Sequence, residues 1–579
     1  MPVNCTDAIY SNEYYDYIIN TSSVLELEQF EEEDACLQSV DRRFLILYRR
    51  GEQNGEDADF FQSELGYNRI PKCFGLMETE NLEASGVGKL RRQPFLNYSG
   101  RGVLVGFVDT GIDYQNPLFQ REDGTSRIAA IWDQTESGGM PPENFLYGRE
   151  YRNEEITEAI LSEEPLRIVP EVDTDGHGTY LAGIAAGNRP ENEEFSGIAY
   201  ESEIVMVKLK EAKDNLKQYF GIPTDRKAYS EADIMLGVKY LVEVAGRLRR
   251  PLVICIGLGS SQGNHTGQTA LGRYLESFTL SSGISIISAA GNEGDRGHHY
   301  GGEMLSFNEE ETVEFQVAEG ESGFTMEVWT SVPSFFNLEL ISPLGETTGV
   351  LSGRLSFYAP SKYRFQFALE SVEVFIETDL VEQFTGQQVI LIRLRNPTEG
   401  IWQLRLLNME RYESRLDIWM PIENFLNPDT RFLRPDPDIT ICEPGNNNGV
   451  ITVSAYEYRN NSLYVFGSRG YTEEGDIKPD IAAPGVNITG PVPGIGETEI
   501  RFENRSGTSV AAAHVAGCAA LLLEWGIYGN ENAGPLPELL NTQIKTYLIR
   551  GATRIPGVVF PNREWGYGSL NIFDTFALL

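Results

Sequence analysis

The sequence lacks the features of a membrane-spanning, secreted or disulfide-dense protein. No 18 apolar residues run together, so we predict no helix that spans a bilayer. The start of the chain, MPVNCTDAIYSNEYYDYIIN, has no basic region followed by an apolar one, so we predict no secretory signal. The six cysteines are far apart and form no C-x-x-C pair: Cys5, Cys36, Cys73, Cys255, Cys442 and Cys518. This usage predicts buried thiols in a reducing compartment rather than a disulfide framework.

Basic residues are scarce relative to acidic ones. The chain of 579 residues carries 47 Lys and Arg against 85 Asp and Glu, which gives a formal net charge of −38. A negative charge of this size disfavours nucleic acids and anionic membranes as partners. The carboxylates are spread along the chain, which is typical of a solvated acidic surface. This length exceeds a single hydrophobic core, so we expect two or three domains.

Apolar runs rich in β-branched residues alternate with helical periodicity in much of the chain. The run at 101–111 ends in Asp-Thr-Gly, which is typical of a buried parallel strand with a polar residue at its carboxyl end. Similar runs lie at 203–209, 251–258, 284–291 and 449–455, and helices are predicted at 231–247 and 268–282. This alternation predicts an α/β domain with a doubly wound parallel sheet.

Two other regions have different patterns. Residues 302–436 show short alternating strands separated by Gly and Pro, which predicts an all-β insert, a sandwich or a jelly roll. Residues 1–80 contain the strand-like YYDYIIN and RFLILYRR and are predicted to form a small α+β unit, with 76–94 as a connector. The predicted domains are the N-terminal unit, the two parts of the α/β domain and the insert between them: 1–80, 81–301, 437–579 and 302–436.

Three polar residues lie where this pattern places functional groups, since active sites of open α/β sheets gather at the carboxyl ends of strands. Asp109 ends the first buried run, although an acid followed by glycine at a strand end is usually a turn residue. His177 lies between two glycines before an apolar helix, which leaves its imidazole uncrowded. Ser509 begins a small-residue helix, either as an N-cap or as a nucleophile beside amides that stabilise an oxyanion.

These residues supply the three groups that a nucleophilic serine requires. A base must remove the hydroxyl proton, and an anion must hold the tautomer of that base and stabilise its imidazolium form. His514 is nearer to Ser509 in sequence, but five helical residues turn it by roughly 140°, so it should face away. His177 is therefore the better base, with Asp109 as its anion.

The segments VDTGID, DGHGTYLAGIAAG and SGTSVAAAHVAG resemble, in this order, the signature segments of subtilisin-like serine proteases. The resemblance implies a subtilisin-like fold and a catalytic triad of Asp109, His177 and Ser509. AAGNEG at 289–294 resembles the oxyanion-hole segment, which implies that Asn292 is the side-chain donor.

The resemblance also implies where the substrate binds. An extended peptide would pair with two segments that line the pocket for the residue before the cleaved bond: Gly257, Leu258, Gly259, Ala289, Ala290 and Gly291. Three positions depart from the family, which usually has histidine at Tyr180, proline at Ala513 and serine at Gly257. The last departure leaves the preference of the pocket open.

The N-terminal unit and the insert make the arrangement similar to the Csp germination proteases of clostridia. This similarity implies a prodomain that templates folding, is cut off within 74–84 and can stay bound over the site. It also implies a cytoplasmic or spore-associated enzyme that activates a precursor protein by limited proteolysis, for Csp-like proteases a zymogen of a spore cortex-lytic hydrolase. Three alternatives stay open: an ordinary accessory domain at the N-terminus, a pseudoprotease that acts as a germination sensor or scaffold, and a general degradative protease of the cytoplasm.

No cofactor is required for this chemistry, and no metal site is predicted. Subtilisins often bind calcium, which stays possible here. The sequence has no D-x-D-x-D-G loop, however, and Asp173 and Asp175 are better explained as part of the histidine segment.

Overall fold

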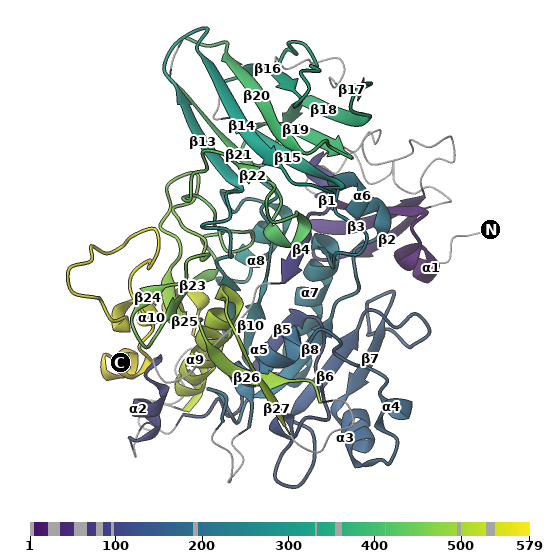
Figure 1. Cartoon of the computed structure of the whole chain (residues 1–579). Helices are drawn as coiled ribbons and strands as arrows, with labels where there is room; N and C mark the ends of the chain where they lie inside the picture. Colours follow the sequence, from purple (N-terminus) through teal and green to yellow (C-terminus); the bar gives the residue numbers. More distant parts are fainter. Residues whose placement is uncertain are drawn as a thin grey trace.

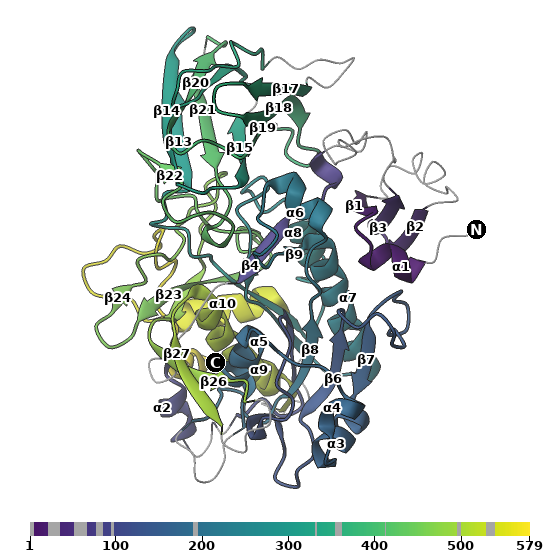
Figure 2. The ribbon, with the colours of Figure 1, turned by 45° about the vertical axis from the view of Figure 1, so that its right-hand side comes forward.

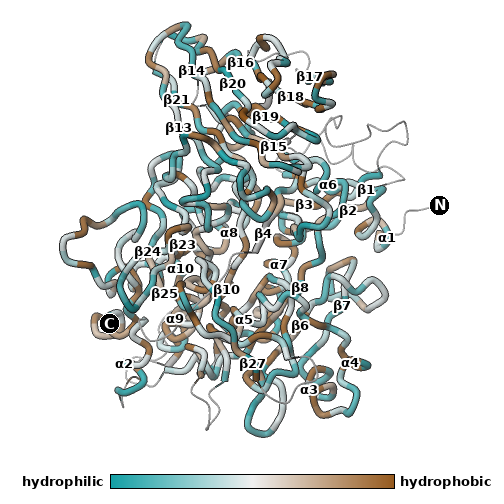
Figure 3. Tube along the Cα trace, in the orientation of Figure 1, coloured by the Kyte–Doolittle hydropathy of each residue, from teal (hydrophilic) through white to brown (hydrophobic). Residues whose placement is uncertain are grey.

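The computed structural model divides into an α/β body, an all-β unit at one end of it and a small N-terminal unit at its side (Figures 1 and 2). Hydrophilic stretches cover the outer loops and hydrophobic stretches fill the interior of the body (Figure 3). The structure describes residues 5–20, 35–50, 67–76, 85–93, 96, 98–188, 195–330, 333–353, 362–411, 413–494, 500–528 and 539–579.

A nine-stranded sheet forms the centre of the body, in the order β24-β23-β12-β10-β5-β8-β6-β7 with β25 beside β23. Its strands run parallel from β6 through to β23 and β25, and β7 and β24 are antiparallel. The strands are β5 Leu104–Asp109, β6 Ile128–Asp133, β7 Arg149–Arg152, β8 Glu203–Lys208, β10 Leu252–Ile256, β12 Ile284–Ala289, β23 Ile451–Glu457, β24 Ser462–Leu463 and β25 Ile481–Pro484. Five of them coincide with the five predicted apolar runs, and the predicted α/β class is confirmed.

Helices cover both faces of this sheet. One buried cluster joins α5 and α9 to the sheet, and a second joins α7 and α8 to its other face. The helices of the body are α2 Val87–Arg91, α3 Asn153–Leu161, α4 Pro165–Ile168, α5 His177–Ala186, α6 Asp214–Phe220, α7 Glu231–Leu248, α8 Ala270–Glu276, α9 Thr508–Tyr528, α10 Asn541–Gly551 and α11 Ile572–Ala577, with 3₁₀ turns η3 Tyr67–Arg69, η5 Pro117–Phe119 and η6 Glu423–Phe425.

Two of these helices differ from expectation. The helix predicted at 268–282 was too long. Helix α8 ends at Glu276, where the backbone tightens into turns in which the amides of Ser277, Phe278 and Thr279 donate to the carbonyls three residues before them. Helix α9 is apolar and long enough to cross a bilayer, which no other helix in the described ranges is, but 89% of the stretch is buried inside the protein. It is the core helix of the body.

Two antiparallel sheets make up the all-β unit, in the orders β13-β21-β15-β19-β18-β17 and β16-β20-β14-β22. Their strands are β13 His299–Met304, β14 Glu310–Val317, β15 Gly323–Thr330, β16 Phe336–Ile341, β17 Lys362–Phe367, β18 Val372–Val381, β19 Gln388–Arg395, β20 Gly400–Asn408, β21 Ser414–Trp419 and β22 Arg431–Phe432. Side chains from both sheets form one core, in which Phe315 and Trp402 are fully buried. The first strand begins slightly before the predicted start at 302, and the jelly-roll topology stays a prediction.

The N-terminal unit consists of helix α1 (Cys5–Tyr10) and a three-stranded sheet in the order β1-β3-β2, with β1 Tyr14–Asn20, β2 Ala35–Ser39 and β3 Phe44–Arg50. Side chains of β1 and β3 enter two different core clusters of the larger structure, so both faces of this small sheet are partly buried. The unit is therefore packed into the rest of the molecule rather than tethered to it.

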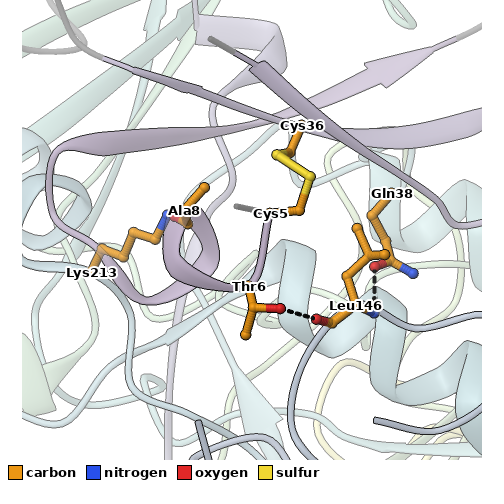
Figure 4. Close-up of a disulfide and its surroundings, with 7 residues drawn as sticks. All are labelled: Cys5, Thr6, Ala8, Cys36, Gln38, Leu146 and Lys213. Carbon is orange, nitrogen blue, oxygen red and sulfur yellow. Dashed lines mark hydrogen bonds between the residues drawn. A yellow bond between two sulfur atoms is a disulfide. The ribbon is translucent and has the colours of Figure 1, made fainter. Parts of the chain in front are cut away.

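The prediction of buried thiols was wrong for Cys5 and Cys36. These two form a disulfide (Figure 4), while the other four are buried free thiols. Folding lays α1 against β2 and brings the two Cα atoms to 5.5 Å, across 31 residues of sequence. Cysteine spacing alone cannot show such a pairing. The same helix contacts the body, since Thr6 Oγ1 donates to the carbonyl of Leu146 at 3.1 Å.

Candidate active site

The three residues predicted to form a triad meet at the carboxyl edge of the central sheet. Asp109 is the last residue of β5, His177 is the first of α5, and Ser509 is the second of α9. His177 Nδ1 lies 2.8 Å from Asp109 Oδ1, and His177 Nε2 lies 3.3 Å from Ser509 Oγ. The two contacts join segments that are 68 and 332 residues apart in sequence. All three residues are buried, with at most 1% of their surface exposed.

Short-range hydrogen bonds hold the acid and the imidazole in place. Asp109 Oδ1 also accepts from the Thr110 amide at 2.8 Å, and the Thr110 hydroxyl accepts from the Gly178 amide at 2.9 Å. Asp173 caps the start of α5, because its carboxylate accepts from the amides of Gly176 and Thr179 at 2.8 and 2.9 Å. Helix α5 therefore begins at His177 with its first turn anchored from two sides.

Asn292 lies beside the start of α9. Its side-chain oxygen accepts from the backbone amide and from the hydroxyl of Thr508, both at 3.1 Å. The Thr508 hydroxyl in turn accepts from the Gly291 amide at 3.0 Å. Since its oxygen is engaged, the amide nitrogen of Asn292 is the group that can donate to a ligand, next to the backbone N–H of Ser509 at the helix terminus.

The two predicted substrate segments flank this constellation. Leu258 and Gly259 form the short strand β11, while Ala289 ends β12 and leads into Ala290 and Gly291. A Cβ atom on Gly257 would lie 3.0 Å from His177 Cε1 and 3.3 Å from Ser509 Cβ. The same atom would lie 2.5 Å from Leu181 Cδ1, so Leu181 fills the space that the usual serine side chain needs. This contact explains why glycine stands at position 257.

The other two departures, Tyr180 and Ala513, lie in helices α5 and α9. Tyr180 is fully buried under the hairpin of β26 (Ile488–Val492) and β27 (Arg501–Arg505), where its hydroxyl donates to the carbonyl of Ile488 at 2.6 Å. Ala513 is fully buried within α9. His514 points away from Ser509, since its Nδ1 lies 2.8 Å from the carbonyl of Val510 on the same helix.

A strand from the N-terminal part of the chain pairs with one of the predicted substrate segments. Strand β4 (Cys73–Leu76) is the centre of a three-stranded sheet, between β11 and β9 (Tyr229–Ser230). It pairs antiparallel with β11, Leu76 opposite Leu258 and Gly75 opposite Gly259. It therefore makes, with β11, one of the two backbone pairings that were predicted for an extended substrate, whereas its other partner is β9 and not the segment 289–291. Of the predicted processing segment 74–84, residues 77–84 lie outside the described residues.

Two cysteine thiols near the site, those of Cys255 and Cys73, stay protonated. Cys255 on β10 is a neighbour of Asp109, and burial raises the pKa of its thiol far above the ordinary value, so it stays protonated and unreactive. Burial likewise raises the pKa of the Cys73 thiol on β4 to about 12. Within the described ranges, no group of three or more His, Cys, Asp or Glu side chains could hold a metal ion.

The family model of the subtilases matches residues 100–323 and 436–568, which include Asp109, His177 and Ser509. The chain belongs to the subtilase family. Subtilases are serine endopeptidases. The break between the two matched spans coincides with most of the all-β unit, so this subtilase carries that unit as an addition to the family domain.

The solved structure of the CspB protease of Clostridium perfringens is 35% identical to this subtilase, with a TM-score of 0.73, and the match covers 86% of this chain and 98% of that one. The predicted similarity to the clostridial Csp proteases is thus confirmed. Subtilisin-like protease SBT2.2 of Arabidopsis thaliana is 27% identical over 34% of this chain and 23% of its own length. C5a peptidase of Streptococcus pyogenes is 22% identical over 73% of this chain and 34% of its own length. This subtilase therefore spans about a quarter to a third of those curated relatives.

Sequence reasoning missed three residues that shape the site. Thr110 donates its backbone amide to Asp109 and accepts at its hydroxyl from Gly178, the Thr508 hydroxyl donates to Asn292, and Leu181 fills the space beside Gly257. Both threonines lie within the recognised motifs, so the motifs themselves hold the available signal. No signal links Leu181 to Gly257, because they are neighbours only across the folded site.

Proposed function

We propose that this subtilase is an active serine endopeptidase that cleaves its own N-terminal unit and then activates a precursor protein by limited proteolysis. The observation that carries this proposal is the hydrogen-bonded chain from Asp109 through His177 to Ser509, with contacts of 2.8 and 3.3 Å. Three segments from distant parts of the sequence bring an acid, a base and a nucleophile together in the hydrogen-bonded order that acyl transfer requires.

Each residue has a defined task in this reaction. Ser509 Oγ attacks the carbonyl carbon of the scissile bond while His177 Nε2 takes its proton. Asp109 accepts the hydrogen bond from Nδ1–H and stabilises the imidazolium that forms. The backbone N–H of Ser509 and the amide nitrogen of Asn292 stabilise the tetrahedral oxyanion, a donor of this kind being worth roughly 3–4 kcal/mol. His177 then protonates the leaving amine, and water repeats the cycle on the acyl-enzyme.

The register of β4 suggests which bond is cut. Leu76 is opposite Leu258, so one more residue in the same register would oppose position 77 to Gly257. Gly257 is the residue whose Cβ position lies 3.3 Å from Ser509 Cβ. We therefore expect the bond after Met77 to be cleaved, which leaves Glu78 at the new N-terminus. This bond lies within the predicted segment 74–84.

The burial of the site supports the proposal that the enzyme is inactive while its N-terminal unit stays in place. Ser509 is fully buried in the intact chain, and β4 pairs with β11, which follows the Gly257 that lies near Ser509. A retained N-terminal unit would keep substrates out, so the enzyme would act when that unit leaves. By similarity to Csp proteases, the proposed substrate is a spore cortex-lytic hydrolase zymogen, and the proposed location is cytoplasmic or spore-associated.

Two measurements test the proposal. Ser509→Ala should leave a single full-length band, whereas the unaltered chain should give two fragments whose new N-terminus is Glu78. Thr508→Ser serves as a matched control at the adjacent position, since it keeps the hydroxyl that Asn292 accepts from. Equal processing of the Ser509→Ala variant would defeat the assignment. A fluorophosphonate probe should label the processed protein once the N-terminal unit has been removed, and a pseudoprotease would stay unlabelled.

A further inference from the structure

Arg505 is placed beside the catalytic histidine, on the hairpin that leads into the nucleophile. It is the last residue of β27, four positions before Ser509. Its Nη2 atom lies 3.3 Å from the position that a Cβ atom would take on Gly176, the residue before His177. Its side chain is only 16% exposed. A cation therefore stands at the edge of the active site in a chain whose net charge is −38.

The guanidinium is held in place from one side. Its carbon lies 5.4 Å from the centroid of the Tyr180 ring, and Tyr180 is itself fixed by its hydrogen bond to the carbonyl of Ile488. Glu503 places its carboxylate 3.4 Å from the guanidinium, but that side chain is 50% exposed, so the contact is weak. The nearby Asp175 is already paired with Lys227 at 3.1 Å.

The direction of β4 shows which part of a substrate would reach this cation. β4 runs antiparallel to β11, and its register leads toward Gly257 and so toward Ser509 and His177. A chain that continues past Ser509 leaves β9 and β11 behind. Beside His177 lie Gly176 and the β26–β27 hairpin, which pack against each other, since a Cβ atom on Gly176 would lie 2.8 Å from Pro493. A substrate chain that continued toward this wall would bring the residue after the cleaved bond near Arg505.

We propose that Arg505 is a specificity residue that selects an acidic side chain at the first position after the cleaved bond. A guanidinium binds a carboxylate through two parallel hydrogen bonds, and it does so best where water is partly excluded. The chain's own sequence fits this requirement, because residues 77–80 read Met-Glu-Thr-Glu. The proposal rests on the proposed self-cleavage and adds a substrate preference to it.

The test is a charge exchange in the full-length chain, made by cell-free synthesis and followed in time for self-cleavage. Glu78→Lys should slow cleavage of the otherwise unaltered chain about tenfold, and so should Arg505→Glu, since a charge-assisted hydrogen bond is replaced by repulsion. The chain with both substitutions should recover to within about threefold of the unaltered rate, because the pair is restored with reversed signs. Arg501→Gln on the same hairpin is the matched control, since this exposed residue carries the same charge.

The outcomes separate this proposal from the one on which it rests. A combined variant no faster than the slower single variant would overturn the role of Arg505, as would equal slowing by Arg501→Gln. Sequencing of the new N-terminus must show an acidic residue; a neutral or basic one in the unaltered chain would also overturn it. If no chain is cleaved and a fluorophosphonate probe leaves Ser509 unlabelled after the N-terminal unit is removed, the proposed protease function fails instead.

Discussion

The buried ion pair between Asp16 and Lys213 should decide whether the N-terminal unit stays in place after cleavage. Lys213 Nζ lies 2.5 Å from Asp16 Oδ1, and the two side chains are 4% and 5% exposed. The same Nζ atom donates to the carbonyls of Ala8 and Tyr14 at 2.8 and 3.2 Å. A cation of the α/β body is thus surrounded by acceptors of the N-terminal unit, including the helix shown in Figure 4.

The cost of breaking this pair follows from its burial. Removal of one partner of a buried pair costs roughly 3–5 kcal/mol, because the other charge is left without compensation. In Asp16→Ala the two carbonyls remain, so we expect the lower end, about 3 kcal/mol. That energy corresponds to about a hundredfold weaker association between the cleaved unit and the body.

Gel filtration of the self-processed protein measures this association. The fragment of the unaltered protein should elute with the body, whereas the Asp16→Ala fragment should separate at concentrations where the unaltered complex persists. Glu13→Ala is the control: its partner Arg50 is 2.5 Å away, but the side chains are 63% and 40% exposed, so the loss should stay below about 1 kcal/mol. Co-elution of the Asp16→Ala fragment, or equal release by Glu13→Ala, would refute the reasoning.

Three further changes have defined outcomes. Gly257→Ser should slow self-cleavage, because overpacking against Leu181 costs roughly 1–3 kcal/mol, and adding Leu181→Ala should restore part of the rate in a time course. Burial raises the pKa of Glu443 to about 7. The folded protein is therefore fully stabilised by the neutral Glu443 below about pH 4.5, and this contribution to the free energy of unfolding is lost as the pH rises through 7. Thermal melts should show that Glu443→Gln stabilises the protein by up to about 3 kcal/mol at pH 8 and by much less near pH 4.5. Replacing both cysteines by Cys5→Ser and Cys36→Ser removes a link across 31 residues and should destabilise the N-terminal unit by about 3–4 kcal/mol, which limited proteolysis would detect. An unchanged self-cleavage rate for Gly257→Ser, an unchanged melt for Glu443→Gln or an unchanged digestion pattern for the double cysteine variant would contradict the respective prediction.

Much of the fold was predictable because it depends on local patterns. Continuous apolar runs identified the five central strands, since strands buried on both faces cannot alternate with polar residues. Helix α7 (Glu231–Leu248) was found at nearly its predicted bounds, whereas α8 ended early, where the backbone tightens into turns whose hydrogen bonds join residues three apart. Strand β4 was missed because its partners, the two-residue strands β9 and β11, carry no periodic signal.

The candidate site also has features that the sequence predicts and features that only the fold reveals. The order of the three motifs, the glycines around His177 and the helix that begins at Ser509 are all recognisable in the sequence, since each is a short continuous segment. Contacts between segments that are distant in sequence cannot be recognised in this way. The Leu181 side chain that requires glycine at position 257 and the approach of Arg505 to Gly176 depend on packing between distant segments.

By itself the sequence determined the class of sheet, the candidate acid, base and nucleophile, and the family that they indicate, because side-chain chemistry and hydrophobic periodicity are local properties. Only the tertiary structure decided that these groups lie within hydrogen-bonding distance, that Cys5 and Cys36 form a disulfide, and that β4 pairs with the predicted substrate segment at β11. Such facts arise when loops of tens to hundreds of residues close, and closure is set by the packing of the whole chain rather than by any one segment.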